Sequence, residues 1–71
     1  MDYDYKGLII TLRNKLVMSQ EEFAKLLGVS FASVNRWEKG HFEPTIQIKK
    51  KIIQMCKDND IKLIMEDKQH D

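Results

Sequence analysis

The sequence contains few of the residues that interrupt a chain or cross-link it: three glycines, one proline and one cysteine among 71 residues. Few glycines and prolines leave few positions where a helix must end, so the composition favours helices. The single cysteine, Cys56, excludes an internal disulfide. Cys56, His41 and His70 are too few and too scattered for a structural zinc site, so we expect neither a metal nor a cofactor.

The sequence also lacks an apolar run of the roughly 20 residues that a membrane-spanning helix needs. Its acidic start, Met1-Asp2-Tyr3-Asp4, differs from the basic opening of a signal peptide, so we expect a cytoplasmic protein. With 42% hydrophobic and 32% charged residues, the composition is that of a folded domain. A chain this short buries only about 60% of its unfolded surface, which leaves room for one small core.

An excess of charge is absent as well, because 12 basic residues face 11 acidic residues and the formal net charge is +1. The distribution is nevertheless uneven. Residues 1–5 carry −2, residues 6–57 carry +6, and residues 58–71 carry −3. A basic body between acidic ends differs electrostatically from a uniformly neutral protein.

Apolar residues at helical spacing predict three helices over residues 4–16, 20–27 and 31–39, and a fourth that begins after Thr45. Ser19 and Glu22 have the spacing of a capping box at the start of the second helix. Gly28 is placed to end that helix, so only a short turn separates it from the third. Two helices joined in this way cross steeply.

The apolar segment 61–65 is too short for periodicity to decide its structure. A short strand, a fifth helical turn and an oligomerisation arm are alternatives. We therefore expect an all-α fold, a compact domain of four to five helices over residues 4–57. An acidic C-terminal tail follows over residues 58–71 and is a candidate for dimerisation or for binding a partner.

The most informative stretch runs from Met18 to Gly40 and continues into the next loop. The residues at characteristic positions in this stretch are Ser19-Gln20-Glu21-Glu22, Ala24, Gly28-Val29-Ser30, Val34, Trp37-Glu38, Gly40 and Pro44-Thr45. This pattern resembles the Xre-type, lambda-repressor-like family of helix-turn-helix DNA-binding regulators, over about residues 8–56. The resemblance implies a lambda-repressor-like domain with its helix-turn-helix at about 20–39.

The outward face of the third helix carries Phe31, Ala32, Asn35 and Arg36. Arginine can bind guanine through two hydrogen bonds, asparagine can bind adenine similarly, and apolar side chains can touch a thymine methyl group. The resemblance places the base-reading positions of the family on these same four residues. Phe31 departs from the family, because many members have a polar residue there, and a contact of Phe31 with the core is equally compatible with the sequence.

The resemblance also implies contacts with DNA phosphates from Gln20, Lys39, His41 and Arg13. In addition, it implies an ion pair between Arg13 and Glu38 that ties the first helix to the end of the third. Such contacts fix the register of a protein on DNA without reading its sequence. By contrast, we expect Trp37 in the core and Cys56 as a small buried side chain.

These features predict a sequence-specific regulator that binds double-stranded DNA as a homodimer, most simply a repressor. The alternative is a protein-interaction module such as an antitoxin, which would bind a toxin and use DNA binding as a secondary activity. An enzyme is not expected, because Glu21 and Glu22 are adjacent on a helix and diverge. No nucleophile, base and orienting group have a recognisable catalytic spacing either.

Overall fold

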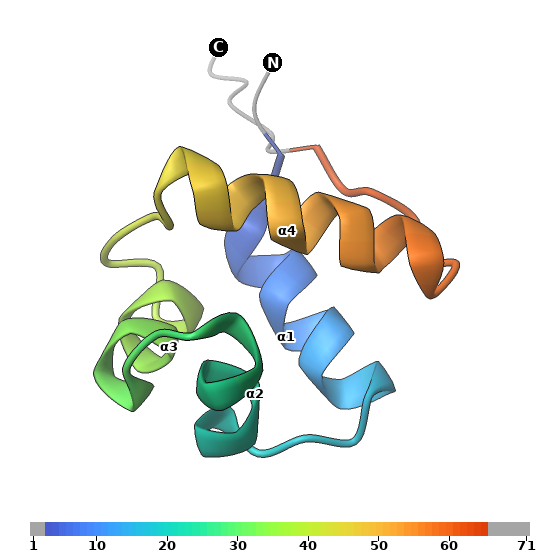
Figure 1. Ribbon diagram of the computed structural model, residues 1–71. Coiled ribbons are helices and arrows are strands. Elements are labelled where there is room, and N and C mark those ends of the chain that lie inside the picture. The colour runs from blue at the N-terminus through green and yellow to red at the C-terminus, as the bar shows by residue number, and fades with distance from the viewer. Residues whose placement is uncertain (1–2, 66–71) are drawn as a thin grey trace, which may run out of the picture.

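The computed structural model describes residues 3–65, which form four helices (Figure 1). Their bounds are α1 (Tyr5–Lys15), α2 (Gln20–Leu27), α3 (Phe31–Glu38) and α4 (Ile46–Asp58). Each predicted helix is present, and the all-α fold is confirmed. In residues 3–65 no helix has the length and apolar character that a membrane span requires.

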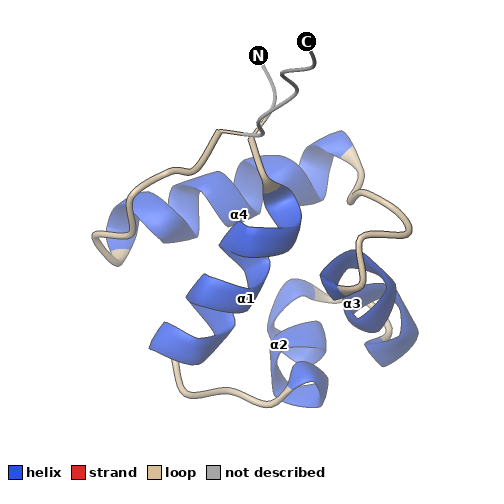
Figure 2. Cartoon of the chain, turned by 180° about the vertical axis from the view of Figure 1, so that it is seen from behind, coloured by secondary structure: helices blue, strands red, loops and turns tan. Residues whose placement is uncertain are grey.

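Helix α1 runs through the middle of the molecule and contacts both α3 and α4 (Figure 1). Helices α2 and α3 pack against each other, whereas α4 crosses α1 on the other side, as the reverse view also shows (Figure 2). The two ends of the described chain lie close together. This arrangement leaves α3 at the edge of the molecule, with one face free to meet a partner.

Every helix contributes buried apolar side chains to one core. The buried residues of this core are Leu8, Ile9, Leu12, Phe23, Ala24, Leu27, Val34, Trp37, Ile52 and Cys56. Within residues 3–65, no polar or charged residue is buried. Trp37 and Cys56 therefore occupy the core positions that the sequence predicts, and burial raises the pKa of the Cys56 thiol.

The junctions around α2 follow from local hydrogen bonding. The backbone N–H of Glu22 donates to Ser19 Oγ at 3.1 Å, and the backbone N–H of Ser19 donates to Glu22 Oε1 at 2.9 Å. These two bonds form the predicted capping box. Gly28 ends the helix with a φ of 75°, a left-handed conformation that glycine adopts without a steric cost. The tight turn that results sets α3 at a steep angle to α2.

The segment after α4 excludes one of the alternatives for residues 61–65. Helix α4 ends at Asp58, and Asp60 then turns the chain with a φ of 56°. Residues 61–65 are extended rather than a fifth helical turn, because they return along the N-terminal segment. Met65 forms an isolated antiparallel bridge with Tyr3, and the backbone N–H of Asp4 donates to Ile64 O at 2.7 Å.

Part of the predicted acidic tail thus packs on the helical body. Ile61 and Leu63 are half-buried against the core, while the side chains of Ile64 and Met65 are 41% and 43% exposed. The remainder of that predicted tail, residues 66–71, lies outside the described residues.

Replacing Ser19 with alanine removes one bond of the capping box at α2. We expect Ser19→Ala to lower the free energy of unfolding by about 1 kcal/mol, because an amide at the start of α2 loses its acceptor. Urea denaturation followed by circular dichroism measures the change. Thr11→Ala is the control, since Thr11 is exposed within α1 and alanine is the better helix former. Equal stability of Ser19→Ala and the wild type would contradict the role of this cap.

Candidate nucleic-acid interface

Helix α3 has one buried face and one exposed face. Val34 and Trp37 point into the core and fix the rotation of the helix about its axis. The four predicted base-reading residues lie on the opposite side of the helix. The second, third and fourth of them follow the first by one, four and five positions, a spacing that places all four on one helical face. These residues are Phe31, Ala32, Asn35 and Arg36. Phe31 is 51% exposed and not part of the core, so its side chain is available to a partner.

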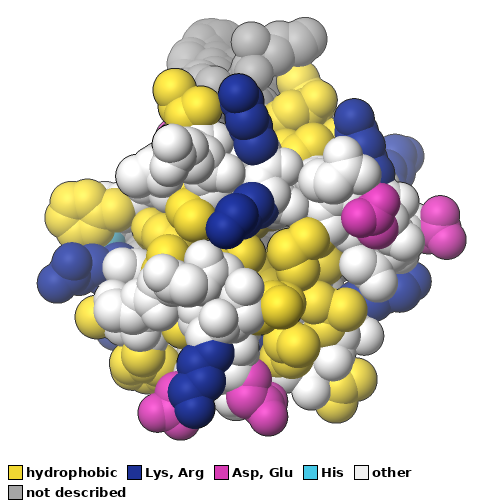
Figure 3. Space-filling model, viewed as in Figure 1, with side chains coloured by type: hydrophobic (Ala, Val, Ile, Leu, Met, Phe, Trp, Pro, Cys, Tyr) yellow, Lys and Arg dark blue, Asp and Glu magenta, His cyan; other side chains and the backbone are white. Residues whose placement is uncertain are grey.

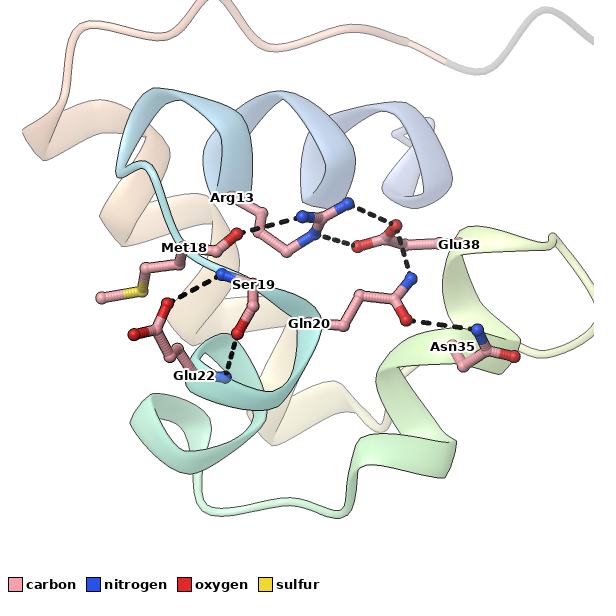
Figure 4. Close-up of polar contacts among 7 residues, drawn as sticks. All are labelled: Arg13, Met18, Ser19, Gln20, Glu22, Asn35 and Glu38. Carbon is pink, nitrogen blue, oxygen red and sulfur yellow. Dashed lines mark hydrogen bonds and ion pairs between the residues drawn. The ribbon is translucent and has the colours of Figure 1, made fainter.

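An ion pair that is largely shielded from solvent ties α3 to α1 (Figure 4). Arg13 Nε donates to Glu38 Oε2 at 2.7 Å, and Arg13 Nη2 donates to Glu38 Oε1 at 3.0 Å. Arg13 Nη1 also donates to the backbone oxygen of Met18 at 3.0 Å, immediately before α2. The Arg13 side chain is 20% exposed and that of Glu38 is 8% exposed. One guanidinium therefore links α1, the end of α3 and the start of α2.

Gln20 extends this network to the exposed face of α3 (Figure 4). Its Nε2 donates to Glu38 Oε1 at 2.9 Å, and its Oε1 accepts a hydrogen bond from Asn35 Nδ2 at 3.2 Å. An ionised carboxylate only accepts hydrogen bonds, so Gln20 must turn its amide nitrogen toward Glu38. Its oxygen then faces Asn35 and fixes which end of the Asn35 amide points inward.

The bond from Gln20 to Asn35 is not predicted by the sequence. The resemblance assigns the Gln20 side chain to a DNA phosphate, whereas in the structure both of its polar atoms bind neighbouring side chains. Residues 15 and 18 positions apart meet here, and no local pattern specifies such a contact. The structure thus shows Gln20 as a bridge between the ion pair and the outward face of α3.

Two opposing influences act on the charge of Glu38. Burial of the carboxyl disfavours its ionised form, but the hydrogen bonds from Arg13 and Gln20, together with the positive charge of Arg13, outweigh burial and lower the pKa of Glu38. The hydrogen bond to Glu38 raises the pKa of Arg13, against the smaller effect of burial. The pair therefore remains ionised at neutral pH.

The loop after α3 carries further exposed side chains. Lys39 caps the helix, and Gly40 turns the chain with a φ of 79°. The backbone N–H of His41 then donates to Arg36 O at 3.1 Å. The side chains of Lys39 and His41 are exposed beside the outward face of α3. In the same loop Phe42 is 62% exposed, and its ring centroid lies 5.7 Å from Arg36 Cζ.

Figure 3 shows basic side chains dispersed over one face of the molecule. Apolar side chains occupy much of the centre of this face, and acidic side chains lie among the basic ones. Within residues 3–65, no three His, Cys, Asp or Glu side chains gather as a metal site. The polar residues placed around α3 are therefore more informative about a partner than the overall charge.

The Arg13 and Glu38 pair should make stability depend on pH. Because the pKa of Glu38 is lowered on folding, its stabilising effect is present above the ordinary glutamate pKa of 4.5 and is lost as the pH falls through the lowered value. We expect Glu38→Gln to lower the free energy of unfolding by about 1–3 kcal/mol at pH 7. This difference from the wild type should narrow below about pH 4.5. Denaturation with urea between pH 7 and pH 3 measures this difference.

The matched control is Glu43→Gln, which removes an exposed ion pair with Lys49. Glu43 is 54% exposed, so this substitution should lower the free energy of unfolding by less than about 1 kcal/mol. An equal cost for the two variants at every pH would show that the network around Glu38 has no special contribution.

Comparison with known families agrees with this architecture. A family model described as Helix-turn-helix, of the Xre or lambda-repressor-like type, matches residues 9–57, which include α2 and α3 entirely. Searches against curated proteins and against solved structures give no significant match. The matched part covers more than half of the chain and contains the network that orients α3. The protein therefore belongs to the Xre or lambda-repressor-like helix-turn-helix family and is a DNA-binding regulator.

Proposed function

We propose that this regulator recognises a specific double-stranded DNA sequence by inserting α3 into the major groove, and that it acts as a repressor. The outward face of α3 carries this proposal, because it presents Phe31, Ala32, Asn35 and Arg36 together. An α-helix fits the major groove, where all four base pairs can be distinguished. A domain bound there represses most simply by occluding a promoter.

The side chains on α3 have complementary hydrogen-bonding abilities. The edge of the Arg36 guanidinium can donate two bonds to the O6 and N7 atoms of guanine. Asn35 keeps its Oδ1 and a second N–H after donating to Gln20, and these two groups match the N6 and N7 atoms of adenine. Phe31 and Ala32 supply apolar contacts for a thymine methyl group.

Residues around α3 are suited to bind phosphates. Lys39 and His41 follow the helix and are exposed. Gln20 lies at the N-terminus of α2, where helical backbone amides and the helix dipole attract anions. Arg13 uses three N–H groups within the network, and a guanidinium has five. We propose these four residues as the contacts that set the register on DNA.

Selection of bound sequences from a random DNA pool tests this function and defines the preferred site. On that site, Arg36→Ala should weaken binding by about 1–3 kcal/mol and relax the preference at one base pair. Lys39→Ala should weaken binding to all sequences alike and reduce the slope of log K against log salt by about one. Fluorescence anisotropy over a salt series measures both effects, and each variant is the control for the other.

Two results would contradict the proposal. Absence of any salt-dependent binding to double-stranded DNA would contradict the proposed function as a whole. An unchanged base preference in Arg36→Ala would remove the assignment of Arg36 and leave DNA binding in place.

We also propose that the protein binds as a homodimer to a two-fold-related site, because a single module of this size has a small interface with DNA. The exposed side chains of Ile64 and Met65 supply an apolar contact for a second copy. The same two side chains favour the alternative function, an antitoxin that binds a toxin through this segment. In that case DNA binding would be the secondary activity.

Substitution in this segment separates the two proposals. If Ile64 contributes to a homodimer, Ile64→Asp should abolish cooperative binding to paired half-sites about 34 Å apart, yet leave binding to one half-site unchanged. Ile46→Asp is the control, since Ile46 is 69% exposed on α4. Sedimentation with and without DNA measures the oligomeric state. A strict monomer in both conditions would exclude the homodimer and favour the alternative.

A further inference from the structure

The loop after α3 places an aromatic ring beside a base-reading arginine. Arg36 Cζ lies 5.7 Å from the centroid of the Phe42 ring, within the range of a cation–π contact. Among residues 3–65, no hydrogen bond or ion pair holds the Arg36 guanidinium. Phe42 is therefore the neighbour that restricts this side chain before DNA is bound.

The position of Phe42 is itself fixed by the loop. Gly40 adopts a φ of 79°, and the backbone N–H of His41 donates to Arg36 O at 3.1 Å, so the chain returns along the end of α3. Pro44 is buried beyond Phe42. Glu43 binds Lys49 of α4 at 2.7 Å, which ties the far end of the loop to the body. Both ends of the loop are thus anchored.

Burial does not explain the presence of Phe42, because 62% of its surface is exposed. Leaving a large aromatic side chain in solvent forgoes the gain from burying it. A cation–π contact uses the face of the guanidinium, whereas a bidentate bond to guanine uses its N–H edge. Both interactions can therefore be made by Arg36 at the same time.

We propose that Phe42 is a positioning residue that orders the Arg36 guanidinium for recognition of a base. This inference rests on the proposed function, in which Arg36 reads a base in the major groove. A free arginine side chain loses rotamer entropy when it is ordered. Contact with Phe42 supplies part of this order in advance, which increases the preference for the correct base.

The test compares Phe42→Leu, which keeps apolar bulk but removes the aromatic ring, with Phe42→Trp, which keeps a ring. Binding is measured on the selected site and on the same site with the base pair read by Arg36 replaced. Phe42→Leu should lower the preference between these sites about two- to fivefold, and Phe42→Trp should retain it. In an Arg36→Ala background, Phe42→Leu should have no further effect.

A second measurement needs no DNA and keeps the inference separate from the proposed function. In the free protein, the ring current of Phe42 should shift the proton resonances of the Arg36 side chain. That shift should vanish in Phe42→Leu and persist in Phe42→Trp. Ile46→Ala is the control, because it removes another exposed apolar side chain and should change neither the shift nor the preference. Thermal unfolding verifies that all variants are folded.

Four results would overturn the inference. One is an unshifted Arg36 spectrum in the free wild type. Another is an unchanged preference in Phe42→Leu while Arg36→Ala loses its preference, which leaves the proposed function intact. A further one is an equal loss of DNA-binding affinity in Phe42→Leu on all sequences, both alone and in the Arg36→Ala background. That result would show that Phe42 acts independently of Arg36. If Arg36→Ala itself keeps its preference, the assignment of Arg36 fails and this inference fails with it.

Discussion

The ion pair between Arg13 and Glu38 connects three of the four helices. Two of its hydrogen bonds join α1 to the end of α3, and a third reaches the backbone just before α2. Because the pair is largely shielded from solvent, loss of either partner leaves a charge that water cannot fully stabilise. Glu38 also receives the Gln20 amide, and through it the pair reaches Asn35. The orientation of α3 and of one of its exposed side chains thus depends on the same carboxylate.

The distribution of charge complements this local arrangement. A body of +6 lies between acidic ends, yet the net charge of the chain is only +1. Long-range attraction to DNA is therefore modest, and it is screened further by salt. In the proposed function, recognition depends on the few contacts that α3 and its neighbouring loop can make. Two features, the Gln20 bridge and the loop carrying Phe42, contact the neighbouring residues Asn35 and Arg36 of that surface.

Local physical chemistry explains why the helices could be predicted from the sequence. Ser19 and Glu22 lie three residues apart and form a capping box wherever a helix begins at that point. Gly28 ends α2 because glycine tolerates a positive φ. The segment 61–65 could not be predicted in the same way, since its extended form depends on Tyr3 and Asp4 at the opposite end of the chain. Five apolar residues have no periodicity that identifies such a distant partner.

The sequence by itself determined the helix-turn-helix and the outward face of α3, because the 3.6-residue period assigns Val34 and Trp37 to the core. Only the tertiary structure decided how the exposed side chains are held. The amide of Asn35 is oriented by Gln20, 15 residues earlier. The ion pair of Glu38 with Arg13, 25 residues earlier, was implied only by the family resemblance and not by the spacing of residues. Arg36 meets Phe42 because the intervening loop folds back on α3. These contacts depend on the relative placement of helices and loops, which the spacing of residues within one helix does not specify.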